Sequence, residues 1–207
     1  QAFRLISARI YDKILLIYLM WFLRRRNMSD NIKFVLASQS PRRAELLKYI
    51  TPEFEILPSD CDETVPDGVP ADEVPQILAV RKALHVRELR PDALVIGCDT
   101  VVIIDGVILG KPHDAQDAKR MLRLLSGRTH TVVSGVCICL GSKTLSFTQN
   151  TLVSFYDMSD EEIDSYVQEC SPLDKAGAYG IQDRGGLFVK HIDGDFYNIV
   201  GLPIARL

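Results

Sequence analysis

An acidic residue interrupts a long apolar stretch near the middle of the chain. The stretch runs from Ala93 to Lys111 and reads ALVIGCDTVVIIDGVILGK, with Asp99 between two apolar segments. Burying a carboxylate there without a partner would be costly, so Asp99 requires a cation, a metal ion or a wet cleft beside it. Asp99 is therefore a candidate functional carboxylate, and a solvated strand edge is the alternative interpretation.

The same stretch carries a turn signal. Asp105 and Gly106 lie between two runs of β-branched residues, which is the strongest short-range signal for a two-residue hairpin turn. We therefore predict a β-hairpin whose first strand holds Asp99 and whose second strand ends at Gly110.

A second group of candidate residues lies where a predicted strand is followed by a predicted helix. Residues 33–37 read KFVLA, a short buried strand, and Ser40 is a suitable N-cap for a helix over residues 41–49 that begins with proline. The start of a helix offers free N–H groups and a positive dipole end, which Arg42 and Arg43 would oppose. A bound anion explains these arginines better than helix stability does, and solvated arginines are the alternative.

Hydrophobic periodicity and turn residues predict the remaining elements. The expected helices cover Asp72 to Arg90, Asp114 to Leu125 and Ser159 to Glu169. The expected strands cover Phe54 to Leu57, Thr129 to Leu140, Thr144 to Phe155, and a last hairpin formed by Leu187 to Ile192 and Phe196 to Val200. Helices alternate with strands early and strands dominate late, so we predict an α/β fold with a mixed, twisted sheet and flanking helices.

Composition limits the partners of the protein. The chain has 207 residues, of which 47% are hydrophobic and 25% charged, which suits one globular domain with a core. A net charge of -3 argues against duplex nucleic acid, so an anionic ligand must meet a local basic cluster. Five cysteines, mostly in apolar runs, favour a reduced cytoplasmic protein over a disulfide scaffold.

The first 27 residues differ from the rest of the chain. A ten-residue apolar run from Ile14 to Leu23 is followed by three arginines. This run is too short for a transmembrane helix, and the order of apolar and basic residues is reversed relative to a signal peptide. We expect residues 1–27 to be an extension outside the fold and residues 28–207 to form the domain, with no membrane partner; a membrane-surface helix is the alternative.

A set of ordered motifs identifies a family resemblance. In chain order the motifs are SQSPRR (38–43), DET (62–64), GCDTVV (97–102), GKP (110–112), LSGRTH (125–130), DKAGAYGIQ (174–182) and NIVGLP (198–203). Over residues 32 to about 205 the chain closely resembles the Maf family. The resemblance implies a two-lobed fold shared with inosine triphosphatases. It also implies hydrolysis of a nucleoside triphosphate to the monophosphate and pyrophosphate with a divalent metal, Mg²⁺ or Mn²⁺.

The resemblance also implies roles for individual residues. Asp99 is expected to accept a proton and Glu63 to act on the metal or the water, although the two carboxylates could exchange these roles. Glu63 lies in an acidic loop, from Ser59 to Gly68, that would otherwise be read as solvated. The expected catalytic residues are Asp99, Glu63 and Lys111, with Glu63 and Asp99 as metal ligands. The expected substrate-binding residues are Ser38, Ser40, Arg42, Arg43, Lys82, Thr100 and Gln182, several of which form a cationic nest suited to a triphosphate.

Two branches of the family differ at three positions. Arg, Thr and Gln mark the branch that prefers dTTP and UTP, and Trp, Gln and Glu mark the branch that prefers 7-methyl-GTP. This chain has Arg42, Thr100 and Gln182, which implies dTTP and UTP, since a glutamine amide can both donate to and accept from a pyrimidine edge. Asp183 stands where the family usually has glycine, a departure at the edge of the expected base pocket.

Two other functions remain alternatives at this point. A nucleotide-binding regulator of septum formation would need the same cradle without catalysis, and a 7-methyl-GTP pyrophosphatase would need different residues at the branch positions. The presence of Asp99, Glu63 and Lys111 favours an enzyme, because a binding protein has no need of a base beside the phosphates. A homodimer is implied only by the resemblance.

Overall fold

The computed structural model describes residues 32–207, and Phe34–Leu207 form one compact unit. The predicted extension over residues 1–27, and the predicted start of the domain at residue 28, lie outside the described residues. In the described part of the chain, no helix is both long and apolar enough to span a membrane.

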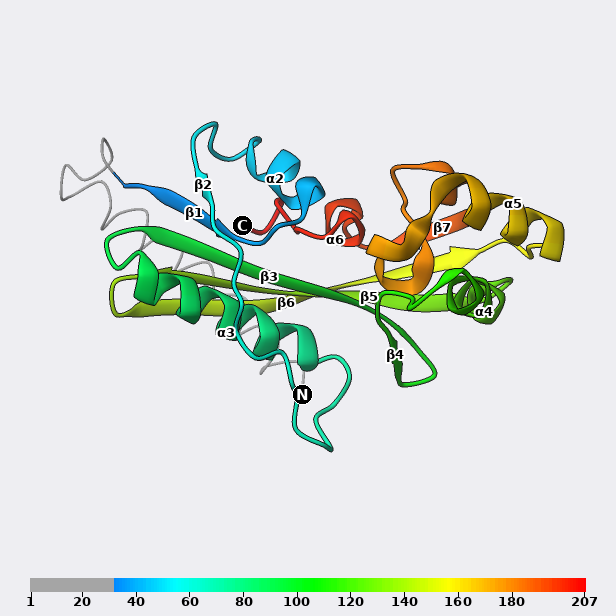
Figure 1. Cartoon of the computed structure of the whole chain (residues 1–207), viewed down its shortest axis with the longest axis horizontal. Coiled ribbons are helices and arrows are strands. Elements are labelled where there is room, and N and C mark those ends of the chain that lie inside the picture. Colours follow the sequence, from blue (N-terminus) through cyan, green and yellow to red (C-terminus); the bar gives the residue numbers. More distant parts are fainter. Residues whose placement is uncertain (1–31) are drawn as a thin grey trace. The chain divides into compact units, whose positions relative to one another are not determined.

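The described residues form a seven-stranded mixed sheet (Figure 1). The strands are β1 (Phe34–Ala37), β2 (Glu55–Ile56), β3 (Leu94–Ile104), β4 (Val107–Leu109), β5 (Thr129–Leu140), β6 (Lys143–Phe155) and β7 (Val189–Asp193). The order is β2-β1-β3-β5-β6-β7, and β4 pairs with β3 as the predicted hairpin. β1 is parallel to β2 and β3, whereas the other pairs are antiparallel, so the prediction of a mixed sheet is confirmed.

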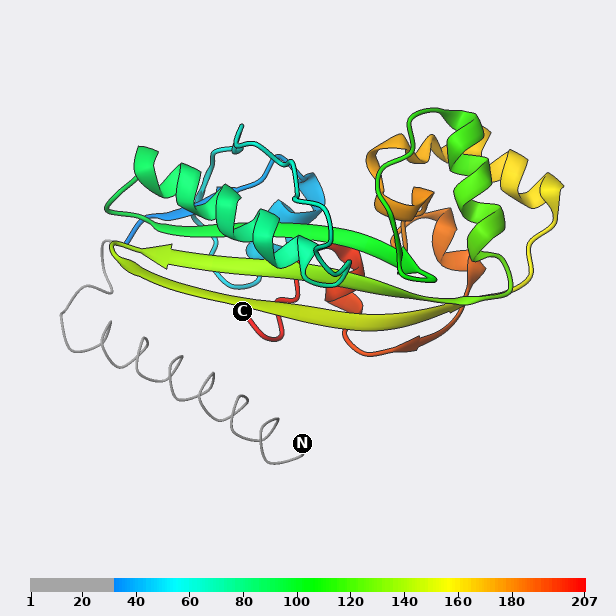
Figure 2. The ribbon, with the colours of Figure 1, turned by 90° about the horizontal axis from the view of Figure 1, so that it is seen from below.

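Helices flank the long strands in two groups. The helices are α2 (Pro41–Leu47), α3 (Val74–Leu89), α4 (Ala115–Leu125), α5 (Asp160–Cys170) and α6 (Phe196–Val200), with short 3₁₀ segments η1 (Pro172–Asp174), η2 (Ala176–Ala178) and η3 (Arg184–Phe188). α3 lies along one end of β3 and β5, while α4 and α5 gather at the other end (Figure 2). Each group has its own apolar cluster, one around Val95 and one around Leu122, which agrees with the predicted two lobes.

Two glycines bring α3 onto the sheet. A Cβ atom on Gly97 of β3 would collide with the carbonyl oxygen of Ala79, and one on Gly135 of β5 would collide with the carbonyl oxygen of Pro75. The backbone of the helix therefore rests where these two strands have no side chain. This close approach brings Lys82 of α3 over Asp99 of β3.

The predicted last strand is wrong. The segment Phe196–Val200 forms α6 rather than the second strand of a hairpin. Asp195 caps this helix by accepting a hydrogen bond from the Tyr197 N–H at 2.8 Å. Asn198 is fully buried and donates to the carbonyl oxygen of Val132 at 3.0 Å, so the polar anchor outweighs the strand-like composition.

A buried histidine packs against the apolar cluster around Leu122. His130 is 2% exposed, and its ring meets Phe155 and Tyr179 edge-on. Its Nε2 atom is 2.9 Å from the Tyr179 hydroxyl, whereas Nδ1 has no hydrogen-bond partner among the described residues. Burial lowers the pKa of His130 from 6.5 to about 4, so the ring stays neutral at physiological pH.

His130 makes the stability of the fold depend on pH. Below pH 6.5 the unfolded chain takes up a proton on this residue while the folded chain does not, so stability falls as pH falls from 6.5 toward about 4. Between pH 6.5 and about pH 5, wild type should lose about 1–2 kcal/mol more unfolding free energy than His130→Gln in urea titrations. As a control, substitution of the exposed His191 by Gln should leave the pH dependence of the unfolding free energy as in wild type. If His130→Gln lost as much unfolding free energy as wild type over this pH range, the account would be contradicted.

The contact between Gly135 and α3 predicts a further effect on stability. Gly135→Ala should reduce the free energy of unfolding by about 1–3 kcal/mol, because the added methyl group meets helix backbone that cannot rotate away. Gly110→Ala is the matched control, since a Cβ atom there meets nothing within 4 Å. Both values come from urea unfolding monitored by circular dichroism, and equal stability of the two variants would show that the helix does not rest on the glycine.

Candidate active site

A pocket of about 820 Å³ lies among the ends of several elements. It is lined by the turn between β1 and α2, by α3, by the middle of β3, and by the segment that contains η1 and η2. Each of the predicted site residues lines this pocket: Ser38, Ser40, Arg42, Arg43, Glu63, Lys82, Asp99, Thr100, Lys111 and Gln182. The fold thus brings together residues that are up to 144 positions apart, from Ser38 to Gln182.

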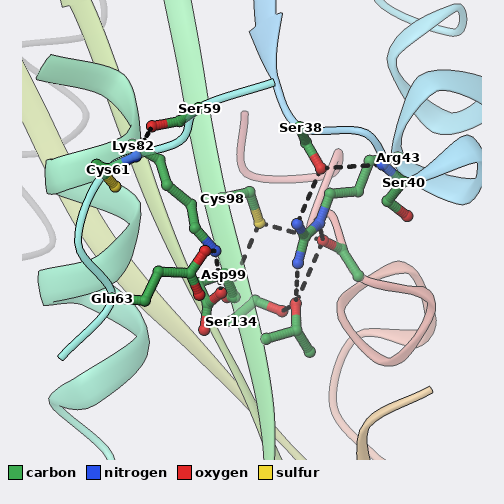
Figure 3. Close-up of polar contacts among 12 residues, drawn as sticks. Ser38, Ser40, Arg43, Ser59, Cys61, Glu63, Lys82, Cys98, Asp99 and Ser134 are labelled. Carbon is green, nitrogen blue, oxygen red and sulfur yellow. Dashed lines mark hydrogen bonds and ion pairs between the residues drawn. The ribbon is translucent and has the colours of Figure 1, made fainter. Parts of the chain in front are cut away.

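Lys82 and two carboxylates form the centre of the pocket (Figure 3). The Nζ atom of Lys82 is 2.6 Å from Asp99 Oδ1 and 3.2 Å from Glu63 Oε1. The side chains of Lys82 and Asp99 are only 12% and 14% exposed, whereas that of Glu63 is 54% exposed. Of the three surroundings expected for Asp99, a cation, a metal ion or a wet cleft, the structure supplies a cation, Lys82.

These two carboxylates stabilise the charged form of Lys82. Burial opposes the charged ammonium group, but the ion pairs with Asp99 and then Glu63 outweigh burial and raise the pKa of Lys82 above its usual value. A permanent cation is thus held between two carboxylates. Such an arrangement can bind an anion at Lys82 or a divalent cation at the carboxylates, provided that the partners exchange.

An arginine that sequence analysis did not select fixes the loop of Glu63. Arg81, on α3, donates from Nη1 to the carbonyl oxygens of Asp62, at 3.2 Å, and of Thr64. These residues stand on either side of Glu63, so the acidic loop is attached to the same helix that carries Lys82. Only its place next to Lys82 in the sequence could have suggested this role.

Arg43 is held by the protein on all sides of its guanidinium group. It donates to the carbonyl oxygen of Gly201 at 2.9 Å, to Ser38 Oγ at 3.1 Å and to Thr100 Oγ1 at 3.1 Å. Figure 3 shows this fork between the turn after β1 and the chain after α6. Arg43 therefore joins three segments of the pocket wall, and Thr100 takes part through that contact.

The N-terminus of α2 differs in one detail from the prediction. Ser40 occupies the N-cap position and Pro41 the first helical position, as expected, but the Ser40 side chain makes no capping hydrogen bond. Instead, its backbone N–H donates to Ser38 Oγ at 3.2 Å. The bond to Ser38 tightens the turn, and the Ser40 hydroxyl is left to line the pocket.

Arg42 reaches across the pocket to a residue that the sequence did not single out. Its Nη1 atom is 2.7 Å from Asp174 Oδ2, and Lys175 Nζ is 2.6 Å from Asp174 Oδ1. Burial opposes ionisation of Asp174, but the hydrogen bonds from Lys175 and Arg42 outweigh it and lower its pKa to about 2. The DKAGAYGIQ motif was recognised, yet no signal in it distinguished these two residues.

Gln182 lies in a segment that Asp183 stabilises. Asp183 Oδ1 accepts from the Gly185 N–H at 2.8 Å and from the Tyr166 hydroxyl at 3.1 Å. The Tyr166 hydroxyl in turn accepts from the Gly180 N–H at 3.1 Å. The residue at the position where glycine was expected therefore caps η3 and lines the pocket beside Gln182.

The carboxylates of the pocket fit a divalent ion that arrives with a ligand. Among residues 32–207, no group of three or more His, Cys, Asp or Glu side chains could hold a metal ion. Glu63 and Asp99 offer two carboxylates that share Lys82 as a partner. Magnesium commonly binds through one or two carboxylates together with phosphate oxygens and water, so this donor set fits such an ion.

Comparisons with known proteins agree with the motifs around this pocket. A dTTP/UTP pyrophosphatase of Bacillus cytotoxicus is 49% identical over 175 residues, which cover 84% of this chain and 92% of the relative. A dTTP/UTP pyrophosphatase of Bacillus cereus strain AH187 is 48% identical over the same shares.

Two solved structures are similar at lower levels. The Ham1 protein of Staphylococcus aureus has a TM-score of 0.44 and 16% identity, with 60% of this chain and 72% of that chain covered. A HAM1 protein from Coxiella burnetii has a TM-score of 0.42 and 16% identity, covering 60% and 73%.

The family model described as Maf-like protein matches residues 33–207, the range that contains every residue of the pocket. With that match and relatives close to half identical over most of their length, the chain belongs to the Maf family.

Proposed function

We propose that this protein hydrolyses dTTP and UTP to the nucleoside monophosphate and pyrophosphate. The observation that carries the proposal is the largely buried Lys82–Asp99 ion pair, with Glu63 beside it, at the centre of a pocket lined by further cations. The names of the relatives, dTTP/UTP pyrophosphatase, support this activity and these substrates.

The size and charge of the pocket suit a nucleoside triphosphate. Its volume of about 820 Å³ is within the range of about 300–1,000 Å³ that small-molecule sites occupy. Arg42, Lys82, Lys111 and Lys175 line it and offer positive charge for three phosphates, although the whole protein is acidic.

The reaction needs a base for water and charge neutralisation on the phosphates. Asp99 is ion-paired through Oδ1, so the ionised carboxylate keeps a fixed orientation and can accept a proton from water through Oδ2. Lys82 and Lys111 hold phosphate oxygens, and the more exposed Glu63 orients the water.

A divalent ion would add to this charge neutralisation. Glu63 and Asp99 are the residues that would hold Mg²⁺ or Mn²⁺ together with the substrate. When bound, such an ion withdraws electron density from the phosphate oxygens and makes the phosphorus more open to attack.

The segment after η2 selects the nucleobase of the substrate. Gln182 lines the pocket and can pair with a pyrimidine edge through its amide, which both donates and accepts. Thr100 contributes indirectly, since its hydroxyl accepts from Arg43 and lies 2.8 Å from Ser134 Oγ. Arg42 reaches from α2 to Asp174 at the rim of the pocket.

The cellular setting is part of the proposal. The cysteines of the described residues are free thiols, which suits a reducing compartment, and the proposed substrates are cytoplasmic nucleotides. We propose a cytoplasmic enzyme that acts on free nucleotides rather than on nucleic acid or at membranes, and that forms a homodimer.

Substrate specificity can be measured directly. With magnesium present, the protein should release pyrophosphate from dTTP and UTP, and kcat/KM for 7-methyl-GTP should be at least about tenfold lower, because Gln182 is suited to a pyrimidine. The assay follows monophosphate and pyrophosphate by chromatography, with CTP included. Preference for 7-methyl-GTP would overturn the assignment of substrate, and nucleotide binding without any hydrolysis would favour a regulator.

The role of Asp99 predicts the effect of removing its charge. Asp99→Asn should lower kcat by about 10²–10⁴-fold, because the amide cannot accept the proton, while the protein still binds UTP in calorimetry. Asp105→Asn, a similar change in the exposed ion pair with Arg128, should retain wild-type turnover. An Asp99→Asn enzyme within tenfold of wild type would show that another group is the base.

A further inference from the structure

Two cations at the rim of the pocket share a single carboxylate. Arg42 and Lys175 both contact Asp174, at 2.7 and 2.6 Å, through different oxygens. Arg42 also lies 3.4 Å from the backbone carbonyl oxygen of Asp174. All three residues line the pocket that the proposed function gives to the substrate, although Arg42 and Asp174 are 132 positions apart in the chain.

The position of Asp174 allows its carboxylate to be replaced by another anion. Its side chain is 57% exposed, whereas those of Lys175 and Arg42 are 15% and 30% exposed. The two cations are thus less exposed than the carboxylate between them, which can turn toward solvent. Lys175 also lies 3.7 Å from Asp183, which would partner it after such a turn.

Carboxylate and phosphate oxygens compete for the same donors. An arginine guanidinium group and a lysine ammonium group can each donate hydrogen bonds to a carboxylate or to a phosphate with similar geometry. A phosphate that binds the donors now occupied by Asp174 must therefore displace it, and Asp174 returns when the phosphate leaves. Through its ion pairs with Arg42 and Lys175, the Asp174 carboxylate competes with every phosphate ligand at this rim. The product pyrophosphate is one of these ligands.

We propose that Asp174 is an internal competitor for the phosphate-binding cations Arg42 and Lys175, and that it promotes release of pyrophosphate after hydrolysis. The inference rests on the proposed function for the identity of the product. Asp174 acts through the two cations and so is a positioning residue. It keeps Arg42 and Lys175 in place without substrate, and it weakens the hold on a small, highly charged product.

Asp174→Asn tests this inference, because it removes the charge and keeps the shape. Pyrophosphate should inhibit the variant at a concentration about three- to tenfold lower than wild type, since two partly exposed ion pairs no longer oppose it. KM for UTP should fall, and kcat should fall with it where product release limits turnover. Weaker or unchanged inhibition would overturn the proposal, and would assign Asp174 to bridging the two sides of the pocket.

Direct binding separates this inference from the proposed function. Calorimetry of pyrophosphate with magnesium, in the absence of nucleotide, should show tighter binding to Asp174→Asn than to wild type. This result would stand even if no nucleotide were hydrolysed, which would refute only the proposed function. Asp105→Asn, which removes a carboxylate from an ion pair outside the pocket lining, should bind pyrophosphate as wild type does.

A second comparison tests whether the effect passes through the cations. In a background of Arg42→Met with Lys175→Met, Asp174→Asn should change pyrophosphate affinity by less than twofold, because the competing donors are absent. If the full effect remains in that background, Asp174 acts by general repulsion and the proposed competition is wrong.

Discussion

The ion pair between Lys82 and Asp99 is the interaction on which the rest of the pocket depends. Both side chains are largely buried, so each charge lowers the cost of burying the other. Their meeting requires α3 to lie directly on β3 and β5, which the missing side chains of Gly97 and Gly135 permit. Along β3, Asp99 also lies between a residue of one apolar cluster, Val95, and a residue of the other, Val102.

The pocket solves an electrostatic problem by pairing. Several cations must stand close together to receive a triphosphate, yet they would repel one another in an empty site. In the free protein Asp99 and Glu63 pair with Lys82, and Asp174 pairs with both Arg42 and Lys175. In the proposed function, a nucleoside triphosphate and a divalent ion would replace these ion pairs with new ones. The empty site would then need no unpaired charges, and the ligand would bind by exchange of partners.

Local patterns in the sequence predicted most of the elements. Apolar runs and turn residues located the long strands, the hairpin at Asp105, and α3, α4 and α5 within a few residues. The sequence also indicated that Asp99 needs a cation, a metal ion or a wet cleft beside it, because burial of an unpaired carboxylate is costly. The family resemblance supplied the candidate site residues, and each of these candidates lines the pocket.

Contacts between distant segments could not be predicted in the same way. The segment Phe196–Val200 has the composition of a strand, but buried hydrogen bonds of Asn198 to β5 and β6 hold it as a helix. The contact of Arg42 with Asp174 spans 132 positions and depends on the packing of η1 against the rest of the pocket. The helix at Phe196–Val200 and the contact of Arg42 with Asp174 both depend on tertiary structure. Hydrophobic periodicity and secondary-structure propensity carry no information about such contacts.

The most direct test of the central ion pair is the turnover of Lys82→Met with UTP and magnesium. Methionine nearly matches the length of the lysine stem but removes the charge that holds Asp99 and Glu63. The account predicts a loss of pyrophosphate release of at least about 10²-fold in a protein that circular dichroism shows to be folded at the assay temperature. Turnover within a few-fold of wild type would contradict it, because the centre of the pocket would then function without its cation.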